Sequence, residues 1–470
     1  MEFVNRHVEM GVIRRALTER TPCLARVYGR RRLGKTEMLG RLCRELGGLY
    51  LLVDDADAAT QRDSLSRQIA EHGLGTTVFP SWDSFFLHLP SLKRPFIVLD
   101  EAQHLLEADR SAVSRLQHRW DSRMSKSGPS IVICGSVVGL MERMVRRKAA
   151  PLFGRLMLDL KVRPFGYAAT RLLYPGMGEL DRIRRFAVFG GTPFYHIMSV
   201  NRELRPAIEE SFFREGAALV DEPESLLRLE LRRPARYNSI MLEIGQGTHD
   251  LRELETKIQV KKGGLSPYLA VLCRDMDLVR LDEPVCGLRK RARYVFTDPF
   301  FSFYYREVYR RKARRPAGEQ GMDWKTIESA LDSHVGPWFE AVVREALVLL
   351  NGRTLGSSKI DFYRVGRWWN RTGEEIDVVA EGDNEIIAGE VKWSPARLDL
   401  AVLGRLQQKV AMMESLEGRS VRLLLATAGR IRPELAERAG QLGAVLLDLD
   451  TLTRIFEGAA QTASGLGRGM

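Results

Sequence analysis

The first third of the chain alternates short apolar runs with amphipathic stretches. Four runs have the length and composition expected of buried strands: 24–28, 49–53, 96–99 and 131–134. Residues 37–46 have helical spacing and end at Gly47-Gly48, a common helix stop. Apolar strands that alternate with helices are typical of a parallel sheet covered on both faces. We therefore predict a doubly wound α/β domain over residues 1–165.

The pattern changes after residue 165. Amphipathic helical stretches interrupted by Gly190-Gly191 are followed by three short helical stretches and two strand-like segments, the order of a winged helix. The charged run at 310–316 precedes two glycines and predicts a linker. The predicted parts are a helical lid at 166–230, a winged helix at 231–300, a linker at 301–330, an α/β domain at 331–457 and a flexible tail at 458–470.

Two strands in the last domain alternate polar and apolar residues around a turn-rich stretch, 381–385. If the hairpin is centred on Asp383-Asn384, Asp377 faces Glu390 across the ladder. Lys392 lies two residues beyond Glu390 and therefore points to the same face. Opposed carboxylates repel unless a cation lies between them, and Mg²⁺ or Mn²⁺ suits such oxygen ligands. The alternative is an exposed hairpin with unrelated charges, because this short pattern is frequent by chance.

A phosphate-binding loop follows the first apolar run. The pattern G-x-x-x-x-G-K-[ST] is matched by Gly29, Arg30, Arg31, Arg32, Leu33, Gly34, Lys35 and Thr36. Its backbone N–H groups wrap phosphates, its lysine supplies a point charge and its threonine hydroxyl is a magnesium ligand. The sequence thus predicts binding of ATP and Mg²⁺.

The third apolar run ends in a pair of acids. Asp100 is predicted to hold magnesium, and Glu101 to orient or activate the attacking water. The alternative is a strand that ends in two solvated acids. Ser136, after the fourth run, is either a sensor of the γ-phosphate or a turn residue.

These motifs resemble those of archaeal-type ATPases, a branch of AAA+-related and STAND P-loop proteins. The resemblance begins at Phe3-Val4-Asn5-Arg6-His7-Val8-Glu9 and ends at Gly190-Gly191-Thr192-Pro193-Phe194-Tyr195. It implies that Arg6, Glu9 and Pro193 lie near the adenine, while His7 departs from the acid often found there. Arg155 is either a phosphate-sensing arginine or a helix-surface residue.

Ile376-Asp377 and Glu390-Val391-Lys392 resemble the PD-(D/E)XK nucleases, with Ile376 in place of the usual proline. That resemblance implies a C-terminal α/β restriction-endonuclease-like domain. Its preceding helix often gives another acid, which Glu340 matches, so the predicted metal ligands are Glu340, Asp377 and Glu390. Lys392 would stabilise developing charge or position the nucleophile. Gln408 or Lys409 on the next helix is a candidate contact to the DNA backbone.

The winged helix suggests a second DNA contact. Residues 248–258 and 266–276 have the lengths of a helix-turn-helix pair, and four basic residues decorate the wing: Arg289, Lys290, Arg291 and Arg293. Acidic residues on both helices leave a protein-packing role open. The aromatics of 294–305 favour a core over a base-stacking platform.

The net charge of +12 favours a polyanionic partner such as nucleic acid, although solubility or an arginine-rich proteome also explains it. Five unpaired cysteines at unrelated spacings and the lack of a signal peptide indicate the cytoplasm. Among the longest nearly apolar runs is 131–141, too short to span a bilayer.

We predict an ATPase that binds DNA and cleaves it with a metal-dependent nuclease domain, in defence or mobile-element control. The alternative is an ATP-driven DNA-binding or regulatory switch whose nuclease domain is vestigial. A third reading, a chaperone-like remodeller, requires a homo-oligomeric ring.

Overall fold

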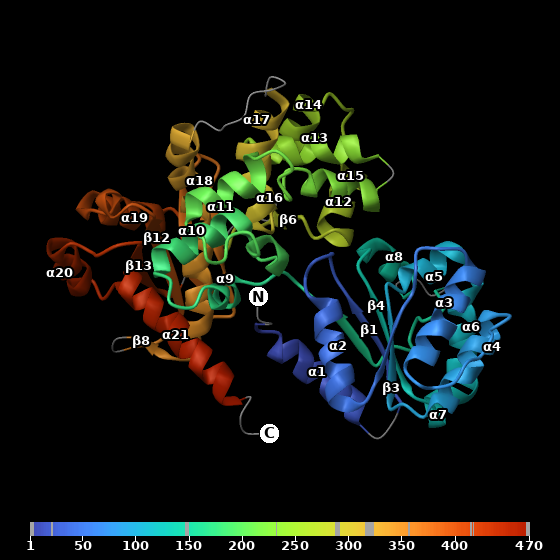
Figure 1. Ribbon diagram of the computed structural model, residues 1–470. Coiled ribbons are helices and arrows are strands. Elements are labelled where there is room, and N and C mark those ends of the chain that lie inside the picture. The colour runs from blue at the N-terminus through green and yellow to red at the C-terminus, as the bar shows by residue number, and fades with distance from the viewer. Residues whose placement is uncertain are drawn as a thin grey trace. The chain divides into compact units, whose positions relative to one another are not determined.

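The fold is described from a computed structural model (Figure 1). The described residues are 4–19, 22–145, 150–231, 233–286, 292–314, 324–355, 358–413, 416 and 418–466. They form two compact units. The first comprises 1–164 with 192–194 and 274–276, and the second comprises the rest of the chain. Residues predicted as lid, winged helix, linker and nuclease-like domain therefore pack together.

The first unit is built on a five-stranded parallel sheet in the order β2-β3-β4-β1-β5. Its strands are β1 (Leu24–Tyr28), β2 (Leu49–Leu52), β3 (Phe96–Asp100), β4 (Ser130–Gly135) and β5 (Leu158–Lys161). The four predicted runs form β1 to β4, so the predicted parallel sheet is confirmed. The edge strand β5 was not predicted, because Leu158-Asp159-Leu160-Lys161 alternates and is too short to stand out.

Helices cover both faces of this sheet (Figure 1). α1 (His7–Thr18) and α2 (Lys35–Leu46) share a core with Ala25 and Val27 of β1. The other core contains Leu24 and Tyr28 of the same strand. On that face lie α3 (Ala58–Glu71), α4 (Trp82–His88), α5 (Gln103–Ala108), α6 (Ser111–Arg119) and α8 (Val138–Arg143). The alternation of side chains along a buried strand thus supplies two cores.

The second unit begins with short helices, as predicted for 166–230. They are α9 (Tyr167–Thr170), α10 (Glu179–Phe189), α11 (Leu204–Ile208) and α12 (Glu222–Glu230). The Gly190-Gly191 break has a steric cause: Gly190 has φ +69°, and a Cβ there would lie 1.8 Å from Asp298 Oδ1. Asp298 also accepts from Phe300 N and so caps the helix α16 (Pro299–Phe303). The glycine therefore lets two chain segments approach each other.

Residues 233–296 contain three helices and then a hairpin. The helices are α13 (Pro234–Gly245), α14 (Leu251–Lys257) and α15 (Ser266–Ala270), which continues as a π-helix at Val271–Asp275. The antiparallel hairpin is β6 (Val279–Asp282) with β7 (Arg293–Phe296). This is the predicted order of elements, with helices shorter than predicted.

The predicted linker at 301–330 is wrong in its first half. Residues 299–314 form α16, a π-helix at Tyr304–Val308 and α17 (Tyr309–Arg314). Phe300, Phe301, Phe303, Tyr304 and Tyr305 are all buried, which confirms that these aromatics belong to the core. Such a segment cannot be a linker, because its apolar area stabilises the fold only while it stays packed. Residues 315–323 lie outside the described part of the chain.

The predicted boundary at 330/331 falls inside one helix, α18 (Trp324–Leu350), which runs through Pro337. Its first half packs against α10, where buried His334 hydrogen-bonds the carbonyl of Ala187 through Nε2 at 2.7 Å. Its second half contacts the strands β10 to β12. Packing on both halves keeps the helix continuous through Pro337.

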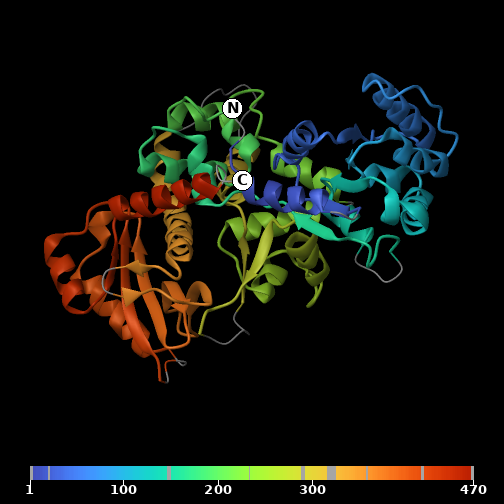
Figure 2. The same ribbon diagram turned by 90° about the horizontal axis from the view of Figure 1, so that it is seen from below.

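The C-terminal sheet has five strands in the order β10-β11-β12-β13-β14. They are β10 (Arg364–Trp369), β11 (Glu375–Glu381), β12 (Glu385–Lys392), β13 (Ser420–Thr427) and β14 (Val445–Leu447), drawn in orange to red in Figure 2. The first three are antiparallel neighbours and the last three are parallel. Val378 pairs with Gly389, so the predicted hairpin register is confirmed.

Helices α19 (Leu400–Ala411) and α20 (Pro433–Gln441) share a core with alternate residues of this sheet, among them Val379 and Ala388. The predicted flexible tail from 458 is wrong up to Leu466, because α21 spans Leu449–Leu466. That helix is anchored by Phe456, whose ring packs edge-on against Tyr167. In the described part of the chain, no helix is long and apolar enough to cross a membrane.

Candidate functional site

The phosphate-binding loop connects β1 to α2. Buried Lys35 donates through Nζ to the carbonyls of Gly29 at 2.7 Å and Arg30 at 2.8 Å, so its charge is held within the loop. Gly29 passes so close to Val162 that a Cβ would lie 2.3 Å from its carbonyl oxygen. The loop geometry therefore depends on glycine here.

Magnesium ligands predicted from two motifs meet beside this loop. Thr36 Oγ1 donates to Asp100 Oδ2 at 2.8 Å, and the Tyr50 hydroxyl donates to the same oxygen. Burial, then Asp100, raises the pKa of Tyr50, so Tyr50 stays a proton donor. Two oxygen donors in contact suit Mg²⁺. Tyr50 was not singled out from the sequence, because a tyrosine in an apolar strand gives no signal of its own.

Glu101 is held by two side chains. Ser136 Oγ donates to Glu101 Oε2 at 2.8 Å, and Gln103 Nε2 donates to the same oxygen. Glu101 itself has φ +52°, an uncommon conformation for this residue. The structure thus places Ser136 as a partner of the predicted catalytic acid. The role of Gln103 was not predicted from the sequence. In the structure, Gly135 leaves room for this side chain, because a Cβ on Gly135 would lie 2.4 Å from Gln103 Oε1.

Arg6, from the segment where the family resemblance begins, contacts the phosphate-binding loop. Arg6 is buried, donates to the Leu33 carbonyl at 3.1 Å and pairs with Glu9 at 2.6 Å. Burial lowers the pKa of Arg6, although the carboxylate of Glu9 has the opposite effect and raises it. Arg32 stacks over the Phe194 ring at 4.2 Å, next to Pro193. The predicted proximity of Arg6 and Pro193 to the adenine stays a prediction.

Arg155 forms a two-pronged ion pair with Asp121, with N–O distances of 2.7 and 2.8 Å. It also donates to the carbonyls of Pro151 and Phe153. The guanidinium is therefore engaged locally, and a phosphate-sensing role would require it to leave Asp121.

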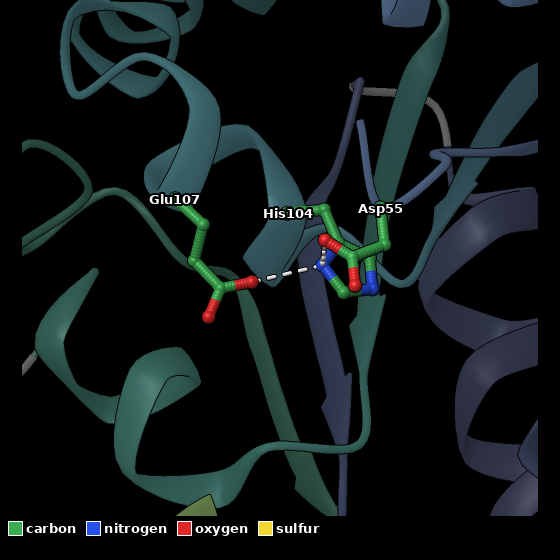
Figure 3. Close-up of side chains that lie close together, drawn as sticks. All are labelled: Asp55, His104 and Glu107. Atoms are coloured by element: carbon green, nitrogen blue, oxygen red, sulfur yellow. Dashed lines mark hydrogen bonds and ion pairs between the residues drawn. The ribbon is translucent and has the colours of Figure 1, made fainter. Parts of the chain in front are cut away.

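His104 lies at the start of α5, shortly after Asp100 and Glu101 in the sequence. Its side chain is located between Asp55 and Glu107 (Figure 3). Its Nδ1 is 2.8 Å from Glu107 and 3.7 Å from Asp55. Within the described ranges, this is the one group of three His, Cys, Asp or Glu residues whose potential metal-ligand atoms all lie within 4.8 Å of one another. Asp55 is 88% exposed, so we interpret the group as a polar cluster in which His104 hydrogen-bonds Glu107 within α5 and lies near the loop after β2.

The second set of predicted residues meets at the end of the β11–β12 hairpin. Lys392 Nζ lies 3.2 Å from Asp377 Oδ2 and 2.6 Å from Glu390 Oε2. Lys409 of α19 lies 2.6 Å from the other Glu390 oxygen. These side chains border a cavity of about 490 Å³. Two carboxylates thus share one cationic partner, Lys392, within one pocket.

The two acids titrate differently. Burial and then Glu390 raise the pKa of Asp377, against the opposing effect of Lys392. Burial also disfavours the charge on Glu390, but Lys392 and Lys409 outweigh it and lower its pKa. Lys392 is the shared counter-charge, and both acids raise its pKa against the effect of burial.

Glu340 borders the same cavity from α18, but its carboxylate pairs with Arg367 at 2.6 Å. Burial raises its pKa to about 7, against the opposing effect of Arg367. In the described ranges Glu340, Asp377 and Glu390 do not form a group whose ligand atoms all lie within 4.8 Å. The predicted three-acid metal site is therefore not assembled, because Arg367 holds Glu340.

The residues predicted to contact DNA differ in their surroundings: some are paired with carboxylates, one is exposed, and three lie outside the described part of the chain. Arg293 pairs with Glu375 at 3.0 Å and stacks over Trp369, so it is bound to the C-terminal sheet. Arg289, Lys290 and Arg291 lie outside the described residues. Lys409 is occupied by Glu390, and Gln408 is exposed.

Comparisons with known proteins cover much of the chain. Residues 3–182 match a family model described as an ATPase domain predominantly from Archaea. Residues 304–403 match one described as archaeal and bacterial proteins of unknown function. The uncharacterized protein MJECL04 of Methanocaldococcus jannaschii is 26% identical over 398 residues, which cover 83% of this chain and 87% of that protein.

Among solved structures, the Walker-type ATPase PABY2304 of Pyrococcus abyssi has a TM-score of 0.50 at 18% identity and covers 65% of this chain and 96% of its own. The ORC2 protein of Aeropyrum pernix has a TM-score of 0.44 at 16% identity and covers 65% of this chain and 93% of its own. The first likeness supports a P-loop ATPase fold, and the second is too low to support an argument. The predicted archaeal-type ATPase domain is therefore confirmed, and the nuclease resemblance stays a prediction.

Proposed function

We propose that the protein binds and hydrolyses ATP and cleaves DNA at a metal-dependent site formed by residues 331–457. The observation that carries this proposal is the convergence of Asp377, Glu390 and Lys392 at one end of a hairpin. The surrounding elements support it: a helix with Glu340 precedes the hairpin, and α19 and β13 follow. This is the order that the resemblance to PD-(D/E)XK nucleases implies.

The donor set fits a hard divalent cation. Asp377 and Glu390 offer carboxylate oxygens that already share a cationic partner, so Mg²⁺ or Mn²⁺ would be held by these two residues. Such an ion would polarise a phosphate and lower the pKa of a bound water. Glu340 is a proton-holding group at this cavity, since its pKa is about 7.

Lys392 has a defined part in this proposal. Its ammonium lies between the two carboxylates, and its pKa is raised, so it remains charged at neutral pH. A charged donor in that place would stabilise a phosphate oxygen as its negative charge grows. Lys409 meanwhile keeps Glu390 ionised and oriented.

The ATPase site would control this activity. Thr36 and Asp100 would hold the magnesium of ATP, and Glu101 would orient the attacking water. Because Ser136 and Gln103 both hydrogen-bond Glu101, a substitution at either residue would change how Glu101 orients the attacking water. A link to DNA cleavage is inferred from the presence of both sites in one chain.

The second candidate is an ATP-dependent DNA-binding or regulatory switch with a vestigial nuclease domain. Two observations favour it. Lys392 and Lys409 already neutralise Glu390, and the third predicted acid is held by Arg367. In that case the carboxylate cluster would be a structural ion-pair network.

A substrate panel separates these functions. Purified protein is incubated with end-labelled duplex, single-stranded and branched DNA in Mg²⁺, in Mn²⁺ or in EDTA, each with and without ATP. We expect cleavage in either metal, none in EDTA, and a change in rate on addition of ATP. Binding of DNA without cleavage of any substrate would favour the switch.

The variant Lys35→Ala tests whether ATP regulates DNA cleavage. It should abolish tight ATP binding, because a phosphate charge loses its buried partner. If this variant cleaves at the wild-type rate with and without ATP, the nuclease stands and control by ATP is rejected. Unchanged ATP affinity in this variant would contradict the assignment of the phosphate-binding loop.

A further inference from the structure

A second cavity, of about 420 Å³, adjoins the one beside Asp377 and Glu390. The two share His249, Val295, Pro337 and Arg367 in their walls. Four arginines line the second cavity, and we call it the arginine pocket: Arg280, Arg306, Arg344 and Arg367. Among the described residues of its lining there is no aspartate or glutamate.

The arginines come from separate parts of the second unit. Arg280 lies on β6, Arg306 on the π-helix after α16, Arg344 on α18 and Arg367 on β10. Four elements far apart in sequence thus bring guanidinium groups to one cavity. Guanidinium groups repel each other, so such a convergence is costly unless carboxylates or a bound anion offset it.

Each arginine of the pocket has a carboxylate partner that lies outside the lining. Arg280 and Arg306 have their own partners, Asp282 at 3.5 Å and Glu307 at 3.3 Å. Glu307 also pairs with Arg311, at 2.6 Å.

The two deeper arginines share Glu340, at 3.6 Å from Arg344 and 2.6 Å from Arg367, and Arg367 also lies 4.0 Å from Glu375. The lining of the pocket therefore presents guanidinium groups, while their carboxylate partners lie outside that lining.

The pocket is also joined to the candidate catalytic residues. Arg344 donates through Nη1 to the backbone carbonyl of Asp377 at 2.9 Å, and Arg367 lies in the walls of both cavities. The rest of the lining includes the aromatic rings of Phe296 and Trp338. Guanidinium forks match phosphate oxygens, and aromatic faces suit sugars and bases. A nucleic-acid strand offers both chemistries in succession.

We propose that the arginine pocket binds the phosphodiester backbone of the DNA strand whose adjacent phosphate is presented to Asp377, Glu390 and Lys392. The identity of that strand as a substrate rests on the proposed function. The pocket would set which phosphate reaches the acids, because contacts to the backbone position a strand without reading its sequence. Arg280 and Arg306 would be positioning residues at the outer rim.

The test uses the two exposed arginines, because their removal leaves the Glu340 pairs intact. Arg280 and Arg306 are 51% and 39% exposed. The matched control removes Arg205 and Arg202, which are 58% and 41% exposed and are also paired with carboxylates, Glu209 and Glu210. Each double variant, Arg280→Gln with Arg306→Gln or Arg202→Gln with Arg205→Gln, thus loses two positive charges of similar exposure from the second unit.

Binding of labelled single-stranded and duplex oligonucleotides is measured by fluorescence anisotropy in EDTA, so that no cleavage takes place, across a salt series. The pocket variant should bind at least about tenfold more weakly at low salt, as expected for loss of charged hydrogen bonds. Its slope of log K against log[salt] should fall by up to about 1.4 for single strands or about 1.8 for duplex. The control variant should match wild type in both quantities, and thermal melting should confirm that both variants are folded.

The inference is overturned if both double variants bind DNA with the wild-type affinity and salt slope. It is also overturned if inorganic phosphate or a mononucleotide binds the pocket while oligonucleotides fail to compete for it. Failure of the nuclease proposal gives a different result: no cleavage in any metal, but binding that still depends on Arg280 and Arg306. Conversely, cleavage with unaltered binding in the pocket variant rejects the pocket alone.

Discussion

Replacing Lys392 with Met removes the cation shared by two carboxylates while keeping a side chain of similar length. The Lys392 ammonium lies 2.6 Å from Glu390 and 3.2 Å from Asp377. At an effective dielectric constant of about 20, the shorter contact alone corresponds to roughly 6 kcal/mol of Coulomb energy. Lys409 still compensates Glu390, so we expect the lower end of the cost of breaking a buried pair, about 3 kcal/mol at pH 7.

The pH dependence of this loss has a definite sign. Burial and then Glu390 raise the pKa of Asp377 in the folded protein above its ordinary value. A raised carboxyl pKa destabilises the fold when the acid is ionised, so the penalty is absent at low pH and grows as pH rises through the folded pKa. Without Lys392 that pKa rises further. The variant should therefore approach wild-type stability at about pH 4 and fall furthest below it at neutral pH.

A divalent cation should partly replace the missing ammonium. With a dissociation constant of about 1 mM, 10 mM Mg²⁺ would stabilise the variant by about 1.4 kcal/mol. Urea unfolding followed by tryptophan fluorescence, with and without Mg²⁺, measures both effects. The control is Lys359→Met, a lysine that is 63% exposed and 3.8 Å from Asp361, where we expect a change within about 0.5 kcal/mol. Wild-type stability of Lys392→Met at pH 7, or no gain from Mg²⁺, would refute the reasoning.

Three further predictions concern Glu101, Ser136 and Glu340. Glu101→Gln should keep ATP affinity and slow hydrolysis about a hundredfold or more, measured by nucleotide titration and phosphate release. Ser136→Ala removes one of two hydrogen bonds to Glu101, so hydrolysis should fall about tenfold at unchanged ATP affinity; weakened binding would indicate a phosphate sensor instead. Because burial raises the pKa of Glu340 to about 7, stability should fall as pH rises from about 4.5 to 7, by up to about 3 kcal/mol. Urea unfolding at pH 5 and pH 8 should show that slope in wild type and a smaller one in Glu340→Gln, where the raised pKa of Asp377 still contributes.

The sequence was most informative where chemistry and periodicity coincide. The hairpin register followed from the turn at Asp383-Asn384 and from side-chain alternation, and the observed pairing of Val378 with Gly389, next to Asp377 and Glu390, agrees with it. The phosphate-binding loop and the Asp100-Glu101 pair were found because both motifs need particular residue types after apolar strands. Local patterns of this kind do not depend on how distant segments pack.

The features that were missed depend on distant packing. The predicted boundary at 330/331 falls inside α18, whose contacts on both halves keep it continuous through Pro337. β10 escaped notice because the register shifts between Gly366 and Trp368, which breaks the alternation. The ion pair between Arg367 and Glu340 joins that strand to α18, and no local sequence pattern predicts this contact.

The most direct test of the central claim is the rate of DNA cleavage by wild type and Asp377→Asn in Mg²⁺, at equal measured occupancy of DNA. Asn keeps the size of the side chain but removes a carboxylate ligand, so cleavage should fall at least about a hundredfold while DNA binding persists. Asp383→Asn, an exposed residue in the turn of the same hairpin, should cleave at the wild-type rate. Equal cleavage by wild type and Asp377→Asn would contradict the assignment of a nuclease site to this hairpin.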